Sequence, residues 1–217
     1  TSDLTALLPD DHPDLVILRE IQGKSSSSTA FMVLLSRNYL FAVDGRGVVH
    51  MHDDTLWHRT RLGAPLNAVW GSDASEVFVA GDRGYAARYD GRRWRRTPTG
   101  TGRALRGLWS GGPGHAIAVG DGGTILEWRD GAWTGLDAGT DANLGAVHGR
   151  DGRVVAVGAG GTVVSRGEGD AAWTTERLEP ARGLTLRGVW LGPGGALHVV
   201  GDGGLWLRRT GDGWRRL

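Results

Sequence analysis

The stretch "AVGDGGTILEWRDGAW" (residues 118–133) combines a glycine-rich turn, a short apolar run and a second turn that ends in tryptophan. A phosphate-binding loop would need a helix directly after the glycines and, in one common form, a Lys-Ser or Lys-Thr pair. A calcium loop would need carboxylates at alternating positions. The stretch has neither pattern, so its meaning depends on where else in the chain it occurs.

The same pattern occurs five times along the chain. The copies are "YLFAVDGRGVVHMHDDTLW" (39–57), "EVFVAGDRGYAARYDGRRW" (76–94), "HAIAVGDGGTILEWRDGAW" (115–133), "RVVAVGAGGTVVSRGEGDAAW" (153–173) and "ALHVVGDGGLWLRRTGDGW" (196–214). Their closing tryptophans are spaced about 40 residues apart. A second anchor precedes the last four copies, as "LNAVWG", "LRGLWS", "LGAVHG" and "LRGVWL". The chain is therefore built from an internal repeat.

Each repeat predicts four short strands. The glycine turn supplies positive-φ positions for one tight hairpin, and Asp-Gly before the closing tryptophan marks another. The repeats show no sustained 3.6-residue period. Four antiparallel strands per repeat of this length are typical of a β-propeller blade. The sequence thus predicts an all-β, five-bladed β-propeller over residues 29–217. Its blades 1 to 5 span about 29–64, 65–102, 103–142, 143–183 and 184–217.

The composition agrees with this fold. Turns between short strands account for 38 glycines among 217 residues, and we expect the ten tryptophans to act as wedges between blades. Cysteine is absent, which excludes disulfides, thiolate metal sites and cysteine nucleophiles. The 25 basic and 24 acidic residues nearly balance. No apolar run is long enough for a transmembrane helix. No cofactor is predicted, and localisation stays open.

Residues 1–28 lie outside the repeat and form an N-terminal arm. Within the arm, "DDHPD" (10–14) predicts an acidic turn, "LVILREIQ" (15–22) an added strand, and "GKSSSST" (23–29) a linker.

Residues 66–94, "LNAVWGSDASEVFVAGDRGYAARYDGRRW", resemble a repeat unit of bacterial propellers related to the BNR or Asp-box superfamily. The resemblance extends over residues 29–217 and implies the propeller fold. The interval from Asp90 to Trp94 is shorter than in the full Asp-box motif. The resemblance therefore does not imply the glycosidase activity of proteins that carry the full motif.

Two groups of residues are candidate metal or ligand sites. The turn carboxylates Asp44, Asp82, Asp121 and Asp202 would share one face of a ring, but Ala159 interrupts the set, so we interpret them as turn formers. His50 and His52 share one face of a strand, and His58 follows, yet nothing fixes a third ligand. We therefore predict no metal, with His50 and His52 as the weak candidates.

The fourth strands carry an uneven distribution of arginine. If the ring closes, blades 5, 1 and 2 would form a continuous basic arc, whereas blades 3 and 4 are neutral to acidic there. This basic rim consists of Arg59, Arg61, Arg92, Arg93, Arg95, Arg96, Arg208, Arg209, Arg215 and Arg216. It would suit an acidic protein surface or a phosphate backbone. Alternatively, the charges prevent edge-to-edge aggregation.

We predict a protein that is not an enzyme, because no nucleophile motif and no converging acid pair is present. The preferred hypothesis is a protein-interaction or scaffold propeller, a recognition module of a larger assembly or polypeptide. Its partner would be another protein with an acidic surface, and nucleic acid stays open. One alternative is a carbohydrate-binding, lectin-like propeller in which Trp128 and Trp206 stack on sugars. A second is a degenerate glycosidase-like enzyme.

Overall fold

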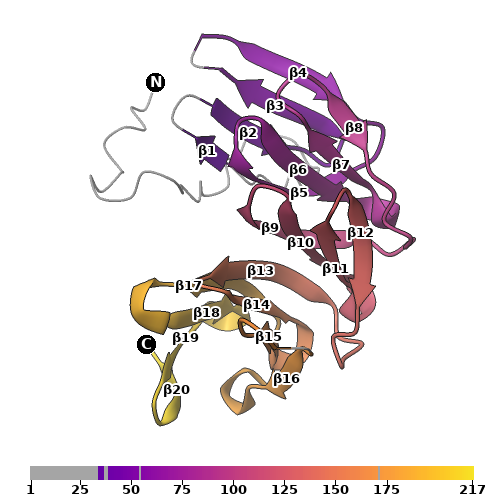
Figure 1. The fold of residues 1–217 in the computed structure, drawn as a ribbon. Coiled ribbons are helices and arrows are strands. Elements are labelled where there is room, and N and C mark those ends of the chain that lie inside the picture. The colour runs from indigo at the N-terminus through magenta and orange to yellow at the C-terminus, as the bar shows by residue number, and fades with distance from the viewer. Residues whose placement is uncertain (1–33, 37–38, 54, 171) are drawn as a thin grey trace.

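The computed structural model describes residues 34–36, 39–53, 55–170 and 172–217. The predicted arm at residues 1–28 lies outside the described residues. Each repeat forms one four-stranded antiparallel sheet whose strands follow the chain order, which confirms the predicted all-β propeller architecture (Figure 1). Within these ranges no helix has the length and apolar character needed to cross a membrane.

The strands are short in every blade. Blades 1 and 2 contain β1 (Leu34–Ser36), β2 (Tyr39–Val43), β3 (Val48–His52), β4 (Trp57–Arg61), β5 (Leu66–Asp73), β6 (Glu76–Gly81), β7 (Ala86–Tyr89) and β8 (Trp94–Arg96). Blade 3 contains β9 (Leu105–Gly112), β10 (His115–Gly120), β11 (Ile125–Arg129) and β12 (Ala132–Leu136). Blades 4 and 5 contain β13 (Leu144–Arg150), β14 (Arg153–Gly158), β15 (Thr162–Arg166), β16 (Thr174–Arg177), β17 (Leu186–Leu191), β18 (Leu197–Gly201), β19 (Leu205–Thr210) and β20 (Gly213–Arg216).

The glycine turn between the second and third strands is a hairpin, as predicted. In blade 3 it forms a single turn of 3-10 helix, and Gly122 has a φ of 62°. Gly123 has a φ of 69°, and its N–H donates to the Ala142 carbonyl at 2.9 Å. A Cβ on Gly123 would overlap the Thr140 carbonyl oxygen. The glycines therefore serve both a left-handed backbone and a close approach to the connection with the next blade.

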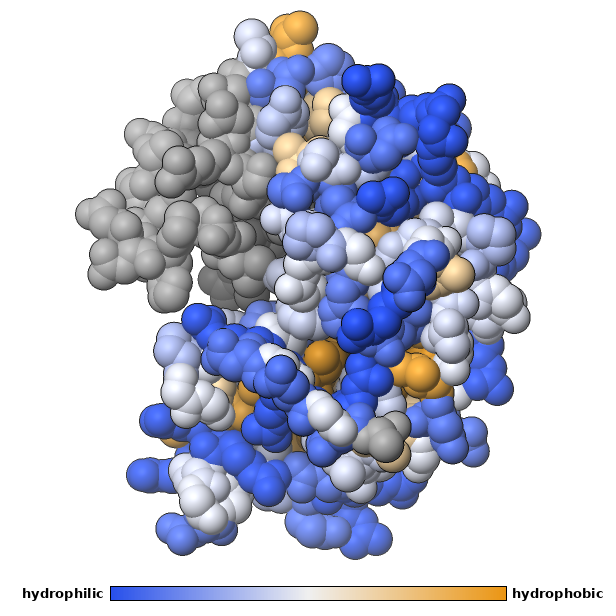
Figure 2. Space-filling model, viewed as in Figure 1, coloured by the Kyte–Doolittle hydropathy of each residue, from blue (hydrophilic) through white to orange (hydrophobic). Residues whose placement is uncertain are grey.

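The blades stack in sequence along an arc (Figure 1). The inner strand β5 packs on β9, β9 on β13, and β13 on β17, while β1 and β2 pack on β5. Four apolar clusters fill the four seams between successive blades. Among the described residues, blade 5 does not pack against blade 1 in this way, so the arc stays open. The face shown in Figure 2 is mainly hydrophilic, with small separate apolar patches.

Most closing tryptophans fill the seams, as predicted. Trp133 and Trp173 are buried between blades 2 and 3 and between blades 3 and 4. Trp94 and Trp214 pack against the seams before their own blades. For Trp57 the prediction is wrong, because this side chain is 55% exposed. No described blade precedes blade 1, so no neighbouring blade among the described residues covers the indole of Trp57.

Candidate functional site

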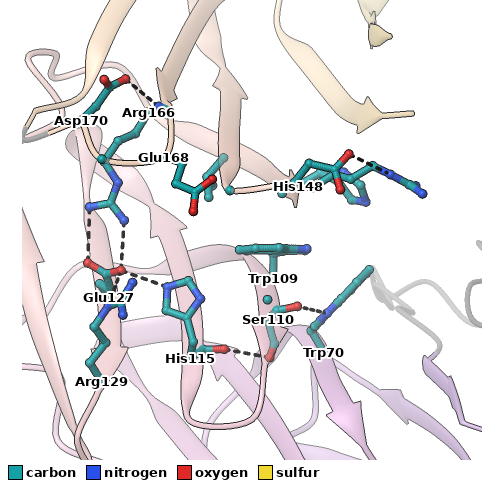
Figure 3. Close-up of a pocket in the computed structure, with 18 residues that line it drawn as sticks. Trp70, Trp109, Ser110, His115, Glu127, Arg129, His148, Arg166, Glu168 and Asp170 are labelled. Carbon is teal, nitrogen blue, oxygen red and sulfur yellow. Dashed lines mark hydrogen bonds and ion pairs between the residues drawn. The ribbon is translucent and has the colours of Figure 1, made fainter. Parts of the chain in front are cut away.

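A cleft of about 690 Å³ opens where blades 2, 3 and 4 meet (Figure 3). First and third strands of a blade run in the same direction, so β9, β11, β13 and β15 all end at this edge of the sheets. The side chains at these ends converge on Trp109, and we call the space the Trp109 cleft. It therefore depends on the register between blades and not on any single repeat.

The indole of Trp109 lies in the cleft between two glycines. An ideal Cβ on Gly111 would approach Trp109 Cη2 to 2.6 Å, and one on Gly149 of blade 4 would overlap the same ring. Beside it, the Trp70 Nε1–H donates to the Ser110 carbonyl at 3.2 Å, which links blade 2 to blade 3. Only glycine at these two positions leaves room for the indole, so the Trp109 ring lies directly against the backbone of Gly111 and Gly149.

One wall of the cleft is an ion-pair network around Glu127. The Glu127 carboxylate accepts from Arg166 of blade 4 at 3.0 and 3.3 Å. It also accepts from Arg129 at 2.9 Å and lies 2.9 Å from His115 Nε2. Burial raises the pKa of Glu127, but the hydrogen bonds from Arg166, Arg129 and His115 outweigh it and bring the pKa to about 2. Glu127 is therefore fully ionised at neutral pH.

His148 borders the cleft from β13 and takes the place that tryptophan has in blades 2, 3 and 5. Its Nδ1 accepts the Leu191 N–H of blade 5 at 3.1 Å. Burial, with a smaller effect from Arg150, lowers the pKa of His148 to about 4. Neutral His148 thus connects blade 4 to blade 5 through this hydrogen bond.

The lining of the cleft carries slightly more carboxylates than guanidinium groups. Lining carboxylates outnumber lining guanidinium groups four to three, and Arg129 and Arg166 already contact Glu127. Glu168 is exposed at the mouth, and Asp170 accepts only the Gly167 N–H among the described residues. The opening therefore offers negative charge next to Trp109.

The turn carboxylates lie at the opposite edge of the sheets and have structural partners. Arg106 of β9 donates to both oxygens of Asp121 at 3.0 and 2.9 Å and lies 3.7 Å from Asp82. Arg187 of β17 binds Asp202 in the same way. Asp44 instead accepts backbone N–H groups of its own turn. Only Asp44 therefore bonds its own turn through its side chain. The side chains of Asp82, Asp121 and Asp202 bind inner strands, so their interpretation as turn formers stays a prediction.

The histidine pair has other partners than a metal. His50 Nε2 lies 3.3 Å from Asp44, and the His52 ring packs on Trp57 with centroids 5.0 Å apart. In the ranges that the structure describes, no three histidine, cysteine or carboxylate side chains cluster to hold a metal ion.

The basic rim falls into two groups. Arg59, Arg61, Arg92, Arg93, Arg95 and Arg96 lie in blades 1 and 2, and Arg208, Arg209, Arg215 and Arg216 lie in blade 5. Arg95 pairs with Asp90 at 3.1 Å, and Arg209 pairs with Glu176 at 2.7 Å. Because blade 5 does not pack on blade 1 in the described chain, inter-blade contacts do not join the two groups.

The two tryptophans predicted to stack on sugars differ. Trp128 is only 6% exposed, and its ring centroid lies 5.5 Å from that of Phe78 and 5.4 Å from that of Trp133. Its prediction as a sugar platform is wrong, because the side chain fills the seam between blades 2 and 3. Trp206 is 48% exposed.

The sequence did not indicate the Trp109 cleft. Its main partners, such as Glu127 and Arg166, are separated by one full repeat and meet only when two blades pack in register. One local signal was available in the Trp-x-Gly spacing of Trp109 and Gly111, which recurs in Trp190 and Gly192. In both cases a Cβ on the glycine would strike the indole.

Comparison with solved structures places this fold among β-propellers. The chain resembles "YCF48 bound to D1 peptide" with a TM-score of 0.67 and 18% identity, over 96% of this chain and 72% of that one. It resembles YCF48 from Cyanidioschyzon merolae with a TM-score of 0.62 and 18% identity, over 86% and 68% of the two chains. The WD40 β-propeller domain of Doa1 gives a TM-score of 0.67 at 13% identity, over 85% and 61%.

No protein-family model matches the sequence, and the comparison with curated proteins found no match. The structural likenesses support the β-propeller fold alone. The narrower resemblance to bacterial BNR repeats stays a prediction from the sequence.

Proposed function

We propose that this protein is a non-catalytic interaction propeller that holds an extended segment of a partner polypeptide in the Trp109 cleft. The observation that carries the proposal is the cleft itself, in which an indole, glycine-lined backbone and the carboxylates of Glu168 and Asp170 meet at one edge of three blades. One of the similar propellers was solved with a peptide bound.

The chemistry of the cleft favours a peptide with a cationic side chain next to an apolar one. Five glycines line the cleft, namely Gly111, Gly149, Gly152, Gly167 and Gly169. Gly111, Gly152 and Gly169 are exposed and can contact a ligand main chain, whereas Gly149 is buried against Trp109. The Trp109 ring provides an apolar surface, and Glu168 and Asp170 at the mouth favour lysine or arginine.

The same geometry argues against acid–base chemistry. A glycosidase acid needs a raised pKa, whereas the pKa of Glu127 is about 2. Both oxygens of Glu127 also bind Arg166, so neither is offered to a substrate. The lectin-like alternative has less support, because Trp128 is buried and only Trp206 is exposed enough to stack on a sugar.

The acidic body of the partner would contact the basic rim. Arg92, Arg93, Arg215 and Arg216 are exposed and extend from the outer strands or their turns. Replacing these four arginines by serine should slow association with an acidic partner and flatten its salt dependence. Unchanged association rates at low salt would contradict a role of the basic rim in binding.

A displayed library of random 12-residue peptides, selected on the full chain, tests the cleft. We expect the selected peptides to combine a basic residue with an aromatic or aliphatic one. Glu168→Arg should weaken their binding at least about tenfold. Glu179→Arg, an equal charge change at a side chain 80% exposed between β16 and β17, should leave it unchanged. Failure to select peptides, or equal loss in both variants, would contradict the proposal.

A further inference from the structure

The end face of blade 5 has an apolar centre, and no other blade of the described chain packs on it. Cross-strand pairing places Trp190 opposite His198 and Val200 opposite Trp206, all on one face of the sheet. Their exposed fractions are 39% for Trp190, 44% for Val200 and 48% for Trp206. The other face of the same strands, represented by Val199 and Leu207, is fully buried against blade 4.

In blades 3 and 4 the equivalent face is covered by the next blade. Residues Ile117, Val119 and Ile125 of blade 3 match His198, Val200 and Trp206 in the repeat alignment, and they are buried under blade 4. The matching residues of blade 4, Val155, Val157 and Val163, are buried under blade 5. All large apolar side chains that are exposed in the described chain belong to blades 1 and 5. The end face of blade 5 therefore lacks the cover that earlier blades have.

Charge on this face defines the chemistry of the cover. Arg208 lies two residues after Trp206 and opposite Arg215, so both guanidinium groups flank the apolar patch on its outer side. The seams between blades 3 and 4 and between blades 4 and 5 pair a carboxylate on the earlier blade with an arginine on the later one, as in Glu127 with Arg166 and Glu176 with Arg209. Blade 5 presents the opposite sign and requires carboxylates from its cover.

The described carboxylates of blade 1, Asp44 and Asp53, already pair with His50 and His58. Cross-strand pairing places Arg59 opposite His50 and Arg61 opposite Val48. The face of blade 1 that points away from blade 2 therefore also carries arginine. Direct closure of blade 1 on blade 5, in the same chain or in a second copy, would oppose like charges at the rim.

We propose that residues 10–22 of this chain, "DDHPDLVILREIQ", cover the end face of blade 5. This segment places three carboxylates, Asp10, Asp11 and Asp14, directly before the aliphatic run Leu15–Leu18. The order matches the face, where Arg208 and Arg215 lie toward the outer strand and Val200 and Trp190 toward the inner one. The proposal is independent of the Trp109 cleft, which lies among blades 2, 3 and 4.

The segment has a long tether to blade 1. Residues 23–33 connect the segment to β1, and an extended chain of that length spans about 35 Å. β1 is the first strand of its sheet, as β17 is in blade 5. Tethering raises the effective concentration of the segment to the order of 1 mM, which favours it over an untethered competitor.

Thiol reactivity tests the proposal, because the chain has no cysteine of its own. In the full chain with Val200→Cys, we expect the thiol to react slowly with a water-soluble aromatic disulfide. Adding Val16→Asp and Leu18→Asp together, or Leu15→Asp and Ile17→Asp together, should accelerate the reaction at least about tenfold for the pair that faces the sheet. The matched control Leu7→Asp with Leu8→Asp adds the same charge outside the segment and should leave the rate within about twofold.

Three further measurements make the outcome decisive. Thermal melting must show that each variant keeps its folded propeller. A synthetic peptide of residues 10–22 should restore slow reaction to the accelerated variant, whereas a scrambled peptide should not. Protection that grows with protein concentration would assign the cover to a second copy, and a rate insensitive to all arm variants would leave the face uncovered. Either result overturns the proposal.

Discussion

Glu127 of blade 3 and Arg166 of blade 4 share two hydrogen bonds, at 3.0 and 3.3 Å, across the seam between their blades. The two side chains are 11% and 17% exposed, so the pair is largely shielded from water. Such a pair fixes the relative position of two sheets, because its geometry is met at only one register. This pair forms one wall of the Trp109 cleft, so the shape of the cleft depends on the register between blades 3 and 4.

Glu127→Gln should lower the free energy of unfolding by about 3 kcal/mol, because it leaves Arg166 without its counter-charge in a shielded seam. Urea denaturation of the two proteins measures the difference. Glu168→Gln, at an exposed position of the same cleft, is the control and should change stability by less than about 0.5 kcal/mol. Equal effects would mean that the Glu127 pair contributes little to the seam.

Gly149→Ala should destabilise the protein by about 2 kcal/mol, because the new Cβ would overlap the Trp109 ring across the seam. The backbone at Gly149 does not have a positive φ, so the effect is steric. Gly145→Ala in the same strand is the matched control, since its Cβ would meet no atom within 4 Å. Urea midpoints that shift equally in both variants would contradict the packing of Trp109 on Gly149.

Lowering the pH should lower the free energy of unfolding, because the unfolded chain takes up a proton at His148 more readily than the folded one. The pKa of His148 falls from 6.5 to about 4 on folding, so the unfolded chain binds the proton more readily. This contribution to stability is complete above pH 6.5 and is lost as the pH falls from 6.5 through 4. Between pH 7 and pH 5 we expect a loss of about 2 kcal/mol.

The matching control is His148→Phe, which keeps an aromatic ring but has no acceptor for the Leu191 N–H and no proton to bind. It should be less stable at pH 7 and should show a flatter profile between pH 7 and pH 5. Denaturant titrations at several pH values measure both profiles. Parallel profiles for the two proteins would show that His148 does not link pH to stability.

Trp133→Ala should cost about 3–5 kcal/mol, because it empties the seam between blades 2 and 3. The Trp133 Nε1–H also donates to Thr97 Oγ1 at 3.0 Å, and its loss leaves Thr97 without that partner. Trp57→Ala at the equivalent position of blade 1 is the control and should have little effect, since Trp57 is exposed. Calorimetric melting distinguishes the two. Similar losses would argue against the wedge role.

The repeat predicted the fold well because each hairpin turn and each closing tryptophan is a local signal. It predicted the direction of Trp128 poorly for a physical reason. Both faces of an inner sheet in a stack are buried, so the alternation of Leu126 and Trp128 with Ile125 and Glu127 does not reveal an exposed side. Trp206 occupies the position of Ile125 and is exposed only because no described blade follows it. The Trp109 cleft arises from contacts one repeat apart, which no single repeat contains.

The serial stacking of the blades, as the described residues form it, has a mechanical consequence. Each inner blade is held by two neighbours and each end blade by one, so the energy of cohesion is distributed along a line. Under tension applied through the two termini, the sheets should therefore detach one after another from the ends, and the central sheet should yield last. Unfolding under force would therefore occur in several steps and not in one cooperative event.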